Sequence, residues 1–382
     1  MAFSVLRRQL YCFTDHGGPK ANGICIAGFY YFIISMATTK PFEFFVQWHL
    51  TESCNLSCRH CYQGERSSEE LPLSEIARGV NEVSDMIRDW SEAYGGAFSS
   101  SMNITGGEPL LRKDLFEILG EIKGRGFKVY LLTNGTLISR DRARKLAALG
   151  LDGVQVSVEG PEHVHDAIRG KGSFAASTDG IERLVDAGLP VTLNVTLSTM
   201  NASSMKKIIA FGSHSGACRI GFSRLVPAGK GRSLLSRMLT REQARDLYEE
   251  LFALELKGIE IVTGDPVASQ MRTKTKVDAG NVAISGCSAG VAGLTILPNG
   301  NVTPCRRLPL ALGNITKDSL REIWSMSPVL GALRDRSRYK GKCRVCGHWA
   351  QCRGCRAIAY AYSRSRGEDD FLAEDPQCFI EP

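Results

Sequence analysis

The spacing of the cysteines limits what this chain can fold into more than any other feature. The sequence has 13 cysteines among 382 residues, and ten of them fall into two groups. The first group is Cys54, Cys58 and Cys61, and the second is Cys287, Cys305, Cys343, Cys346, Cys352, Cys355 and Cys378. Disulfide frameworks are typical of small secreted domains, whereas this chain is long and 43% hydrophobic. Close Cys-x-x-Cys pairs in such a chain indicate ligands of zinc or of iron–sulfur clusters.

The charge balance and the N-terminal residues narrow the class of partner. Lys and Arg number 47 against 40 Asp and Glu, a net charge of +7 without a basic block, so we expect no nucleic-acid partner. The apolar run 24–37 is too short to span a bilayer, so we expect no membrane partner. This run could pass for part of a signal peptide, but reduced cluster ligands belong in a reducing compartment. We therefore interpret residues 1–40 as an N-terminal extension with a start assigned too early, favour Met36 as the true start, and expect a cytoplasmic protein.

From residue 42 the hydrophobic pattern alternates between strand and helix. Strands are predicted at 44–50, 102–105, 129–132, 154–158, 191–197 and 219–226. Helices are predicted at 74–94, 113–125, 139–149, 173–187 and 201–214, and a capping box at Thr240 begins another that reaches about residue 256. This alternation favours a parallel sheet covered by helices, either an open barrel or a doubly wound sheet. In both arrangements functional groups gather at the C-terminal ends of the strands.

The first cysteine group lies directly after the first predicted strand. Cys54, Cys58 and Cys61 have the spacing C-x3-C-x2-C. Three thiolates on a four-iron cluster leave one iron open to a non-protein ligand. This spacing in this position resembles the radical S-adenosylmethionine (SAM) superfamily. The resemblance implies an α/β fold, a partial (β/α)6 TIM-like barrel, and a [4Fe-4S] cluster that binds SAM. Reduction then cleaves SAM to a 5′-deoxyadenosyl radical, which abstracts a hydrogen atom from the substrate.

Further motifs at the strand ends strengthen the resemblance. The Gly-Gly-Glu-Pro motif at 106–109 combines glycines that permit close backbone approach with a carboxylate that can accept from an ammonium group. Arg169 suits the carboxylate group of SAM, because a planar guanidinium can donate two parallel hydrogen bonds to a carboxylate. Glu159 departs from the aspartate that is common in the family, and Asn194 either faces the cofactor or caps a neighbouring loop. The residues that the resemblance implies for SAM binding are Gly106, Gly107, Glu108, Pro109, Thr133, Asn134, Ser157, Glu159, Arg169 and Asn194.

The second cysteine group resembles the SPASM extension of the same superfamily, which holds two auxiliary four-iron clusters. Its pattern is C-x12-G-x4-C, then C-x2-C-x5-C-x2-C and a last cysteine. The resemblance implies that auxiliary cluster I is ligated by Cys287, Cys305 and Cys355. For auxiliary cluster II it implies Cys343, Cys346, Cys352 and Cys378. Cluster I is one ligand short, because Gly293 stands where some relatives have a further cysteine, so its last iron is expected to be open or to take another ligand.

The expected organisation is an extension over 1–40, a barrel over 41–235, a bridging region over 236–284 and a SPASM domain over 285–382. SPASM enzymes include peptide maturases, sulfatase activators and enzymes that modify tetrapyrrole side chains. The sulfatase activators carry an aspartate directly after the second SPASM cysteine, where this chain has Arg306 and Arg307. We therefore discount the sulfatase-activating function.

The favoured function is maturation of a ribosomally made peptide by a crosslink, a thioether or a decarboxylation. The alternative is tetrapyrrole side-chain modification in heme or heme d1 biosynthesis, and Arg306 and Arg307 suit the carboxylates of either substrate. Because about fifty residues precede Cys54, we expect no fused peptide-recognition domain; a recognition protein, if one is needed, would be separate. The enzyme would draw electrons from a low-potential donor such as flavodoxin or ferredoxin.

A non-enzymatic alternative is an electron-transfer protein, which the SAM-binding residues disfavour. The sequence identifies no catalytic base, and Asp265, His348 and Tyr360 are only weak candidates.

Overall fold

The computed structural model describes residues 42–64, 69–96, 98–272 and 282–381. The predicted N-terminal extension over 1–40 lies outside these residues. Within the described ranges, no helix has both the length and the apolar character needed to cross a bilayer.

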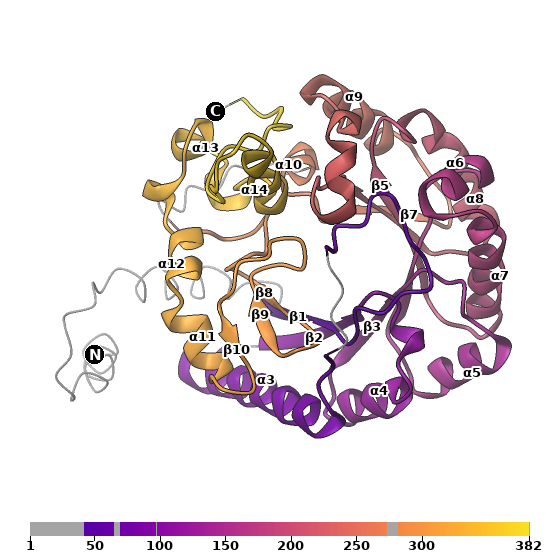
Figure 1. Ribbon diagram of the computed structural model, residues 1–382, viewed down its shortest axis with the longest axis horizontal. Helices are drawn as coiled ribbons and strands as arrows, with labels where there is room; N and C mark the ends of the chain where they lie inside the picture. The colour runs from indigo at the N-terminus through magenta and orange to yellow at the C-terminus, as the bar shows by residue number, and fades with distance from the viewer. Residues whose placement is uncertain (1–41, 65–68, 97, 273–281, 382) are drawn as a thin grey trace.

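The strands of the described residues form one sheet in the order β10-β9-β8-β1-β2-β3-β4-β5-β6-β7. They are β1 (Phe42–His49), β2 (Phe98–Thr105), β3 (Lys128–Thr133), β4 (Gly153–Ser157), β5 (Val191–Leu197), β6 (Arg219–Arg224), β7 (Glu260–Thr263), β8 (Gly293–Ile296), β9 (Asn301–Thr303) and β10 (Gly313–Asn314). All pairs from β8 through β1 to β7 are parallel, whereas β8-β9 and β9-β10 are antiparallel. The strands curve around a central space and the helices lie outside them, which confirms the open barrel (Figure 1).

The helices that cover the barrel are α3 (Leu73–Tyr94), α4 (Leu115–Gly124), α5 (Arg140–Ala148), α6 (Glu162–Arg169), α7 (Ser173–Asp186), α8 (Met205–His214) and α9 (Arg241–Phe252). The C-terminal part adds α10 (Pro266–Ser269), α11 (Leu320–Met326), α12 (Pro328–Arg334), α13 (Lys342–Val345) and α14 (Arg356–Ser365). Local sequence explains the predicted helices. In α3 the buried side chains Ile76, Val80 and Val83 recur at helical spacing. The predicted capping box at Thr240 is present at the start of α9.

Several elements were not foreseen, and three of them bear on the barrel and the site. The stretch that carries Arg169 is a helix, α6, and the apolar run at 260–263 forms the strand β7. The strand β8, which belongs to the C-terminal cysteine region, pairs in parallel with β1. Only four residues long, β8 was hard to recognise, and its pairing depends on a partner more than 240 positions away. The barrel sheet therefore continues into the C-terminal cysteine region.

A buried ion network fastens the C-terminal segment to the barrel. Arg224, at the end of β6, donates to Asp265 with an Nη2–Oδ1 distance of 3.0 Å and to Asp375 with an Nη2–Oδ2 distance of 2.8 Å. All three side chains are buried. Asp375 also accepts from the backbone N–H of Cys355 at 2.8 Å. Removing one member would leave buried charge uncompensated, so this network fixes the C-terminal cysteines relative to the barrel.

Candidate active site

The first cysteine group lies in a cavity at the C-terminal ends of the parallel strands. The cavity encloses about 980 Å³, counting its open mouth. Thr105, Thr133, Ser157 and Arg224 are the last residues of β2, β3, β4 and β6, and they line it together with the cysteine loop that follows β1. Parallel strands bring their carboxyl ends to one edge, so motifs far apart in sequence meet there.

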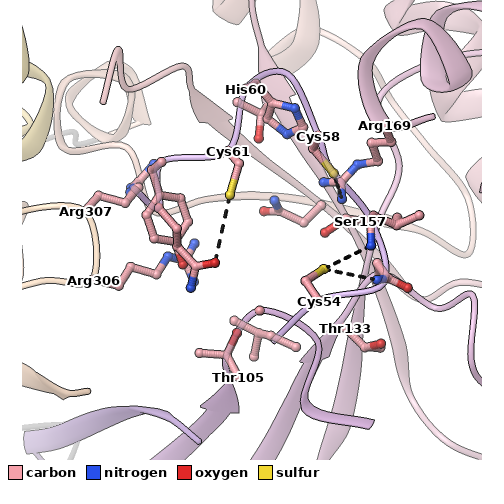
Figure 2. A pocket seen from close by; sticks show the side chains of 18 of the residues that line it. Cys54, Cys58, His60, Cys61, Thr105, Thr133, Ser157, Arg169, Arg306 and Arg307 are labelled. Carbon is pink, nitrogen blue, oxygen red and sulfur yellow. Dashed lines mark hydrogen bonds between the residues drawn. The ribbon is translucent and has the colours of Figure 1, made fainter. Parts of the chain in front are cut away.

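Figure 2 shows the three cysteine side chains between two groups of residues. Arg306 and Arg307 lie on one side of the cavity, and Ser157 and Arg169 lie on the other.

Two of the three thiols, those of Cys54 and Cys58, lie beside N–H donors. The backbone N–H of Leu56 donates to Cys54 Sγ at 3.4 Å, and Nη1 of Arg169 lies 3.8 Å from Cys58 Sγ. All eleven described cysteines are free. Burial raises the pKa of the Cys58 thiol, and Arg169 opposes that effect. Free thiols with N–H donors and a nearby cation are a suitable donor set for the implied cluster. Among the described residues, no three His, Cys, Asp or Glu side chains converge as ligands of a single metal ion would.

Seven of the ten residues implied for SAM binding line this cavity, and three do not. Those that line it are Gly106, Gly107, Thr133, Asn134, Ser157, Arg169 and Asn194. Glu108, Pro109 and Glu159 are outside its lining. The sequence left open whether Asn194 faces the cofactor or caps a neighbouring loop. In the structure, Asn194 lines the cavity.

The Gly-Gly-Glu-Pro motif supports the cysteine loop from behind. The N–H of Gly107 donates to Thr51 O at 2.7 Å, and that of Glu108 donates to Ser53 O at 2.8 Å. A Cβ atom on Gly107 would lie 2.3 Å from Ser53 O, so no larger residue fits there.

The carboxylate of Glu108 is fully buried and is not part of the cavity lining. It accepts from Thr133 Oγ1 at 2.7 Å and from the backbone N–H of Asn134 at 2.8 Å. Burial raises its pKa, and these donors oppose that rise. Glu108 thus holds the Thr133–Asn134 corner in place, a positioning task that the sequence did not distinguish from direct binding.

Glu159 is also fully buried, and its carboxylate is taken up by protein partners. It accepts from Arg169 Nη2 at 2.6 Å and from the backbone N–H of Thr196 at 2.9 Å, and His60 Nε2 lies 3.2 Å away. Burial opposes ionisation, but Arg169 and His60 outweigh it and lower the pKa of Glu159. Glu159 therefore orients Arg169, whose guanidinium reaches the cavity.

On the opposite wall, Arg306, which the sequence analysis singled out, lies beside Tyr62, which it did not. Tyr62 follows the last cysteine of the loop, and Arg306 lies over its ring at 5.8 Å from the centroid. The Tyr62 hydroxyl lies 3.4 Å from Nε2 of the buried His49. Burial, with help from Arg306, lowers the pKa of His49 to about 3, so its imidazole is neutral at ordinary pH. Burial raises the pKa of Tyr62 to about 12.

Arg306 and Arg307 have no carboxylate within ion-pair distance in the described part of the chain. Nε of Arg307 is buried without a hydrogen-bond partner among those residues. Burial and the neighbouring Arg307 lower the pKa of Arg306. These two cations are therefore suited to an anionic ligand that enters the cavity.

The C-terminal cysteines form two separate sets. Cys287, Cys305 and Cys355 line a cavity next to the first one, whose walls also include Arg224 and Arg307. Cys343, Cys346, Cys352 and Cys378 line another cavity. The division is the same as the one that the resemblance implies for the two auxiliary clusters. A Cβ atom on Gly293 would lie 2.5 Å from Phe45 O, so β8 leaves no space there for a further cysteine.

The three candidate bases lie outside the first cavity. Asp265 is in the ion network and lines the cavity of Cys287. His348 lines that of Cys343, and Tyr360 donates to Asp369 at 2.8 Å. Sequence reasoning missed Gln155 and Thr196, which line the first cavity. Both alternate with buried apolar residues along β4 and β5, and that alternation was the available signal.

Comparisons with known proteins agree with this geometry. The sequence model of the radical SAM superfamily matches residues 48–212, and that of the SPASM iron–sulfur cluster-binding domain matches residues 287–356. An AdoMet-dependent heme synthase from Methanosarcina barkeri is 31% identical over 350 residues, covering 88% of this chain and 96% of that protein. The mycofactocin maturase MftC of Mycolicibacterium smegmatis is 32% identical over 327 residues, covering 82% and 78%.

The fold is also similar to that of Streptococcus suis SuiB, solved with S-adenosylmethionine. The TM-score is 0.72 at 16% identity, covering 99% of this chain and 87% of SuiB. The chain belongs to the radical SAM superfamily: it is a SPASM-containing enzyme that uses [4Fe-4S] clusters and S-adenosylmethionine.

Proposed function

We propose that Cys54, Cys58 and Cys61 hold the SAM-binding [4Fe-4S] cluster and that the cavity around them is the active site. Their position at the strand ends and the N–H donors beside the thiols support this assignment. With SAM bound, such a cluster supplies a 5′-deoxyadenosyl radical that abstracts a hydrogen atom. The chain's own residues have to orient SAM, and those proposed for contact are Gly106, Gly107, Thr133, Asn134, Ser157, Arg169 and Asn194.

The two sets of C-terminal cysteines are proposed to hold the auxiliary clusters. Cys287, Cys305 and Cys355 would ligate cluster I, and Cys343, Cys346, Cys352 and Cys378 would ligate cluster II. The proposed units are the barrel over 41–235, the bridging region over 236–284 and the SPASM domain over 285–382. Cytoplasmic flavodoxin or ferredoxin is the proposed electron donor, because reduced thiols and a low-potential donor occur together in that compartment.

The substrate is proposed to carry carboxylates, which Arg306 and Arg307 hold opposite the cysteine loop. One observation carries this proposal: both arginines line the cavity, and no described carboxylate pairs with either. A half-buried guanidinium without a carboxylate partner favours an anionic ligand over a neutral one.

The first candidate substrate is a ribosomally made peptide, held at an acidic residue or at its C-terminal carboxylate. The similarity to the mycofactocin maturase supports it. The second candidate is a tetrapyrrole, whose side-chain carboxylates would occupy the same arginines. The match to a heme synthase over 96% of that protein's length supports this alternative.

Two assays test the proposal. In the first, the enzyme is reconstituted anaerobically with SAM and a low-potential reductant. The variant with all three loop cysteines replaced by alanine should form no 5′-deoxyadenosine, and retained cleavage would contradict the cluster assignment. The Cys343→Ala/Cys346→Ala variant should stay folded and still cleave SAM, but form product slowly.

The second assay offers iron-coproporphyrin III, didecarboxysiroheme and a mycofactocin precursor peptide, with mass spectrometry of the products. Loss of carboxylate-derived mass from a tetrapyrrole would establish the second candidate. A mass change confined to the peptide would establish the first. Replacing Arg306 and Arg307 by glutamine should abolish product formation with whichever substrate reacts.

A further inference from the structure

A second, outer cavity adjoins the active-site cavity and shares Tyr62, Arg306 and Arg307 with it. It encloses about 800 Å³, counting open solvent. Besides Gly64 and Pro309, its remaining walls come from two regions that are distant in sequence. The loop after β6 contributes residues 227–229 and Arg232, and helix α14 contributes Tyr360 and Arg364.

The lining of this outer cavity is strongly basic. Arg232, Arg306, Arg307 and Arg364 are part of it, and no aspartate or glutamate is among the described residues of the lining. Arg232 is exposed, and Arg364 makes one ion pair, with Asp369 at 3.6 Å, in which both side chains are exposed. Exposed pairs of this kind contribute little, so Arg364 is available to another anion. Four cations around one hollow create a positive potential that attracts extended anionic chains.

The outer wall is joined firmly to the cysteine loop. The N–H of Gly231 donates to Cys61 O at 3.0 Å, and Lys230 Nζ donates to Ser57 Oγ at 2.6 Å. Gly229 has a φ of 54°, and a Cβ atom there would lie 2.3 Å from Gln63 O. The loop after β6 therefore packs directly on the backbone that carries the cysteines, and the outer cavity is held in a fixed position relative to the inner one.

We propose that the outer cavity binds an extended acidic segment of the substrate. In this arrangement Arg306 and Arg307 receive the part of the substrate that enters the inner cavity, and Arg232 and Arg364 receive carboxylates farther along the same chain. The inference rests on the proposed function, because it takes the inner cavity as the place of reaction. It specifies an acidic polypeptide rather than a nucleic acid, since the cavity continues into a site that is suited to carboxylates.

The test measures binding separately from turnover. Fluorescein-labelled octaglutamate is titrated with the reconstituted holoenzyme under anaerobic conditions, and fluorescence anisotropy is read at several salt concentrations. Binding should weaken as salt rises. The Arg232→Gln/Arg364→Gln variant should weaken it by about three- to tenfold, as expected for two exposed charge contacts. Iron content and the thermal midpoint show whether the double variant folds. If it does not, Arg232→Gln alone is used for the binding test.

The matched control is Arg140→Gln/Arg144→Gln, which removes the same charge from the exposed surface at the start of α5. It should bind octaglutamate as tightly as the wild type does. Equal weakening in both double variants would overturn the proposal, as would equally tight binding of a labelled octathymidylate. SAM cleavage by the wild-type preparation tests the cluster assignment independently, so failure of one idea is distinguishable from failure of the other.

Discussion

Arg169 and Glu159 form a buried pair beside the cysteine loop, with 2.6 Å between Arg169 Nη2 and Glu159 Oε1. The same guanidinium reaches Cys58 Sγ with Nη1 at 3.8 Å. Glu159 is thus a positioning residue, and it fixes a cation between the proposed cluster and the proposed SAM site.

Replacing Arg169 by lysine should raise the KM for SAM by about tenfold, because an ammonium group cannot contact Glu159 and a carboxylate in the same forked geometry. Iron content should remain that of the wild type, and 5′-deoxyadenosine formation at varied SAM concentration gives the KM. Arg59→Lys is the control, since Arg59 lies in the cysteine loop but is exposed and outside the cavity. An unchanged KM in Arg169→Lys would remove Arg169 from the SAM site.

Glu108→Gln should destabilise the protein by about 1–3 kcal/mol, because the new amide NH2 group faces at least one N–H or O–H donor. SAM affinity should fall as well, because Glu108 holds the Thr133–Asn134 corner. Anaerobic urea denaturation and SAM binding measure the two effects. Glu117→Gln on the exposed face of α4 should change neither quantity. Wild-type stability in Glu108→Gln would show that this corner does not depend on the carboxylate.

Gly293→Cys should fail to supply auxiliary cluster I with a fourth cysteine. The new Cβ would press on Phe45 O, and overpacking of this kind costs at least about 1–3 kcal/mol. We expect a lower thermal midpoint and no gain in iron content. Gly331→Ala in α12 is the matched control, because nothing lies near its Cβ position, and it should stabilise the protein by up to about 1 kcal/mol. A stable Gly293→Cys protein with altered cluster spectra would contradict this prediction.

His165 should make the protein less stable in weak acid. Its side chain is buried, its Nδ1 accepts from the N–H of Glu159 at 3.3 Å, and burial, together with Arg169, lowers its pKa to about 4. The unfolded chain protonates this histidine below a pH of about 6.5, whereas the folded protein does so only near pH 4. Stability is therefore lost as the pH falls through this window, by about 2 kcal/mol between pH 7.5 and pH 5.

Urea denaturation at these two pH values should show that the free energy of unfolding falls less in His165→Gln than in the wild type. His163→Gln, an exposed change on the same helix, should keep the wild-type loss. Equal losses of stability in all three proteins would mean that the folded protein protonates His165 as readily as the unfolded chain does.

Much of the fold was predictable because its signals are local. The helix α3 carries its buried residues at regular spacing, and β5 alternates buried and half-buried positions along the predicted range. The predicted and observed boundaries of elements differ where the hydrophobic periodicity does not mark an end. The predicted helix at 201–214 begins as α-helix only at Met205, after a short 3-10 turn. The predicted strand at 219–226 stops at Arg224, whose side chain turns into the ion network.

The sequence by itself determined the cysteine loop and its place after β1, because three cysteines within eight residues need only a local turn to come together. It also determined the alternation of strands and helices, since side-chain periodicity reports which face of each element is buried. It implied, through a family resemblance, the division of the C-terminal cysteines.

The tertiary structure decided the roles of residues that meet across the fold. Glu108 and Glu159 are bonded to protein groups outside the cavity lining, Arg306 and Arg307 lie across the cavity from Arg169, and Arg224 joins the barrel to Asp375. Each of these contacts joins residues far apart in sequence. The periodicity of one element cannot specify such a contact, because it depends on how two elements pack and on which buried charges find partners.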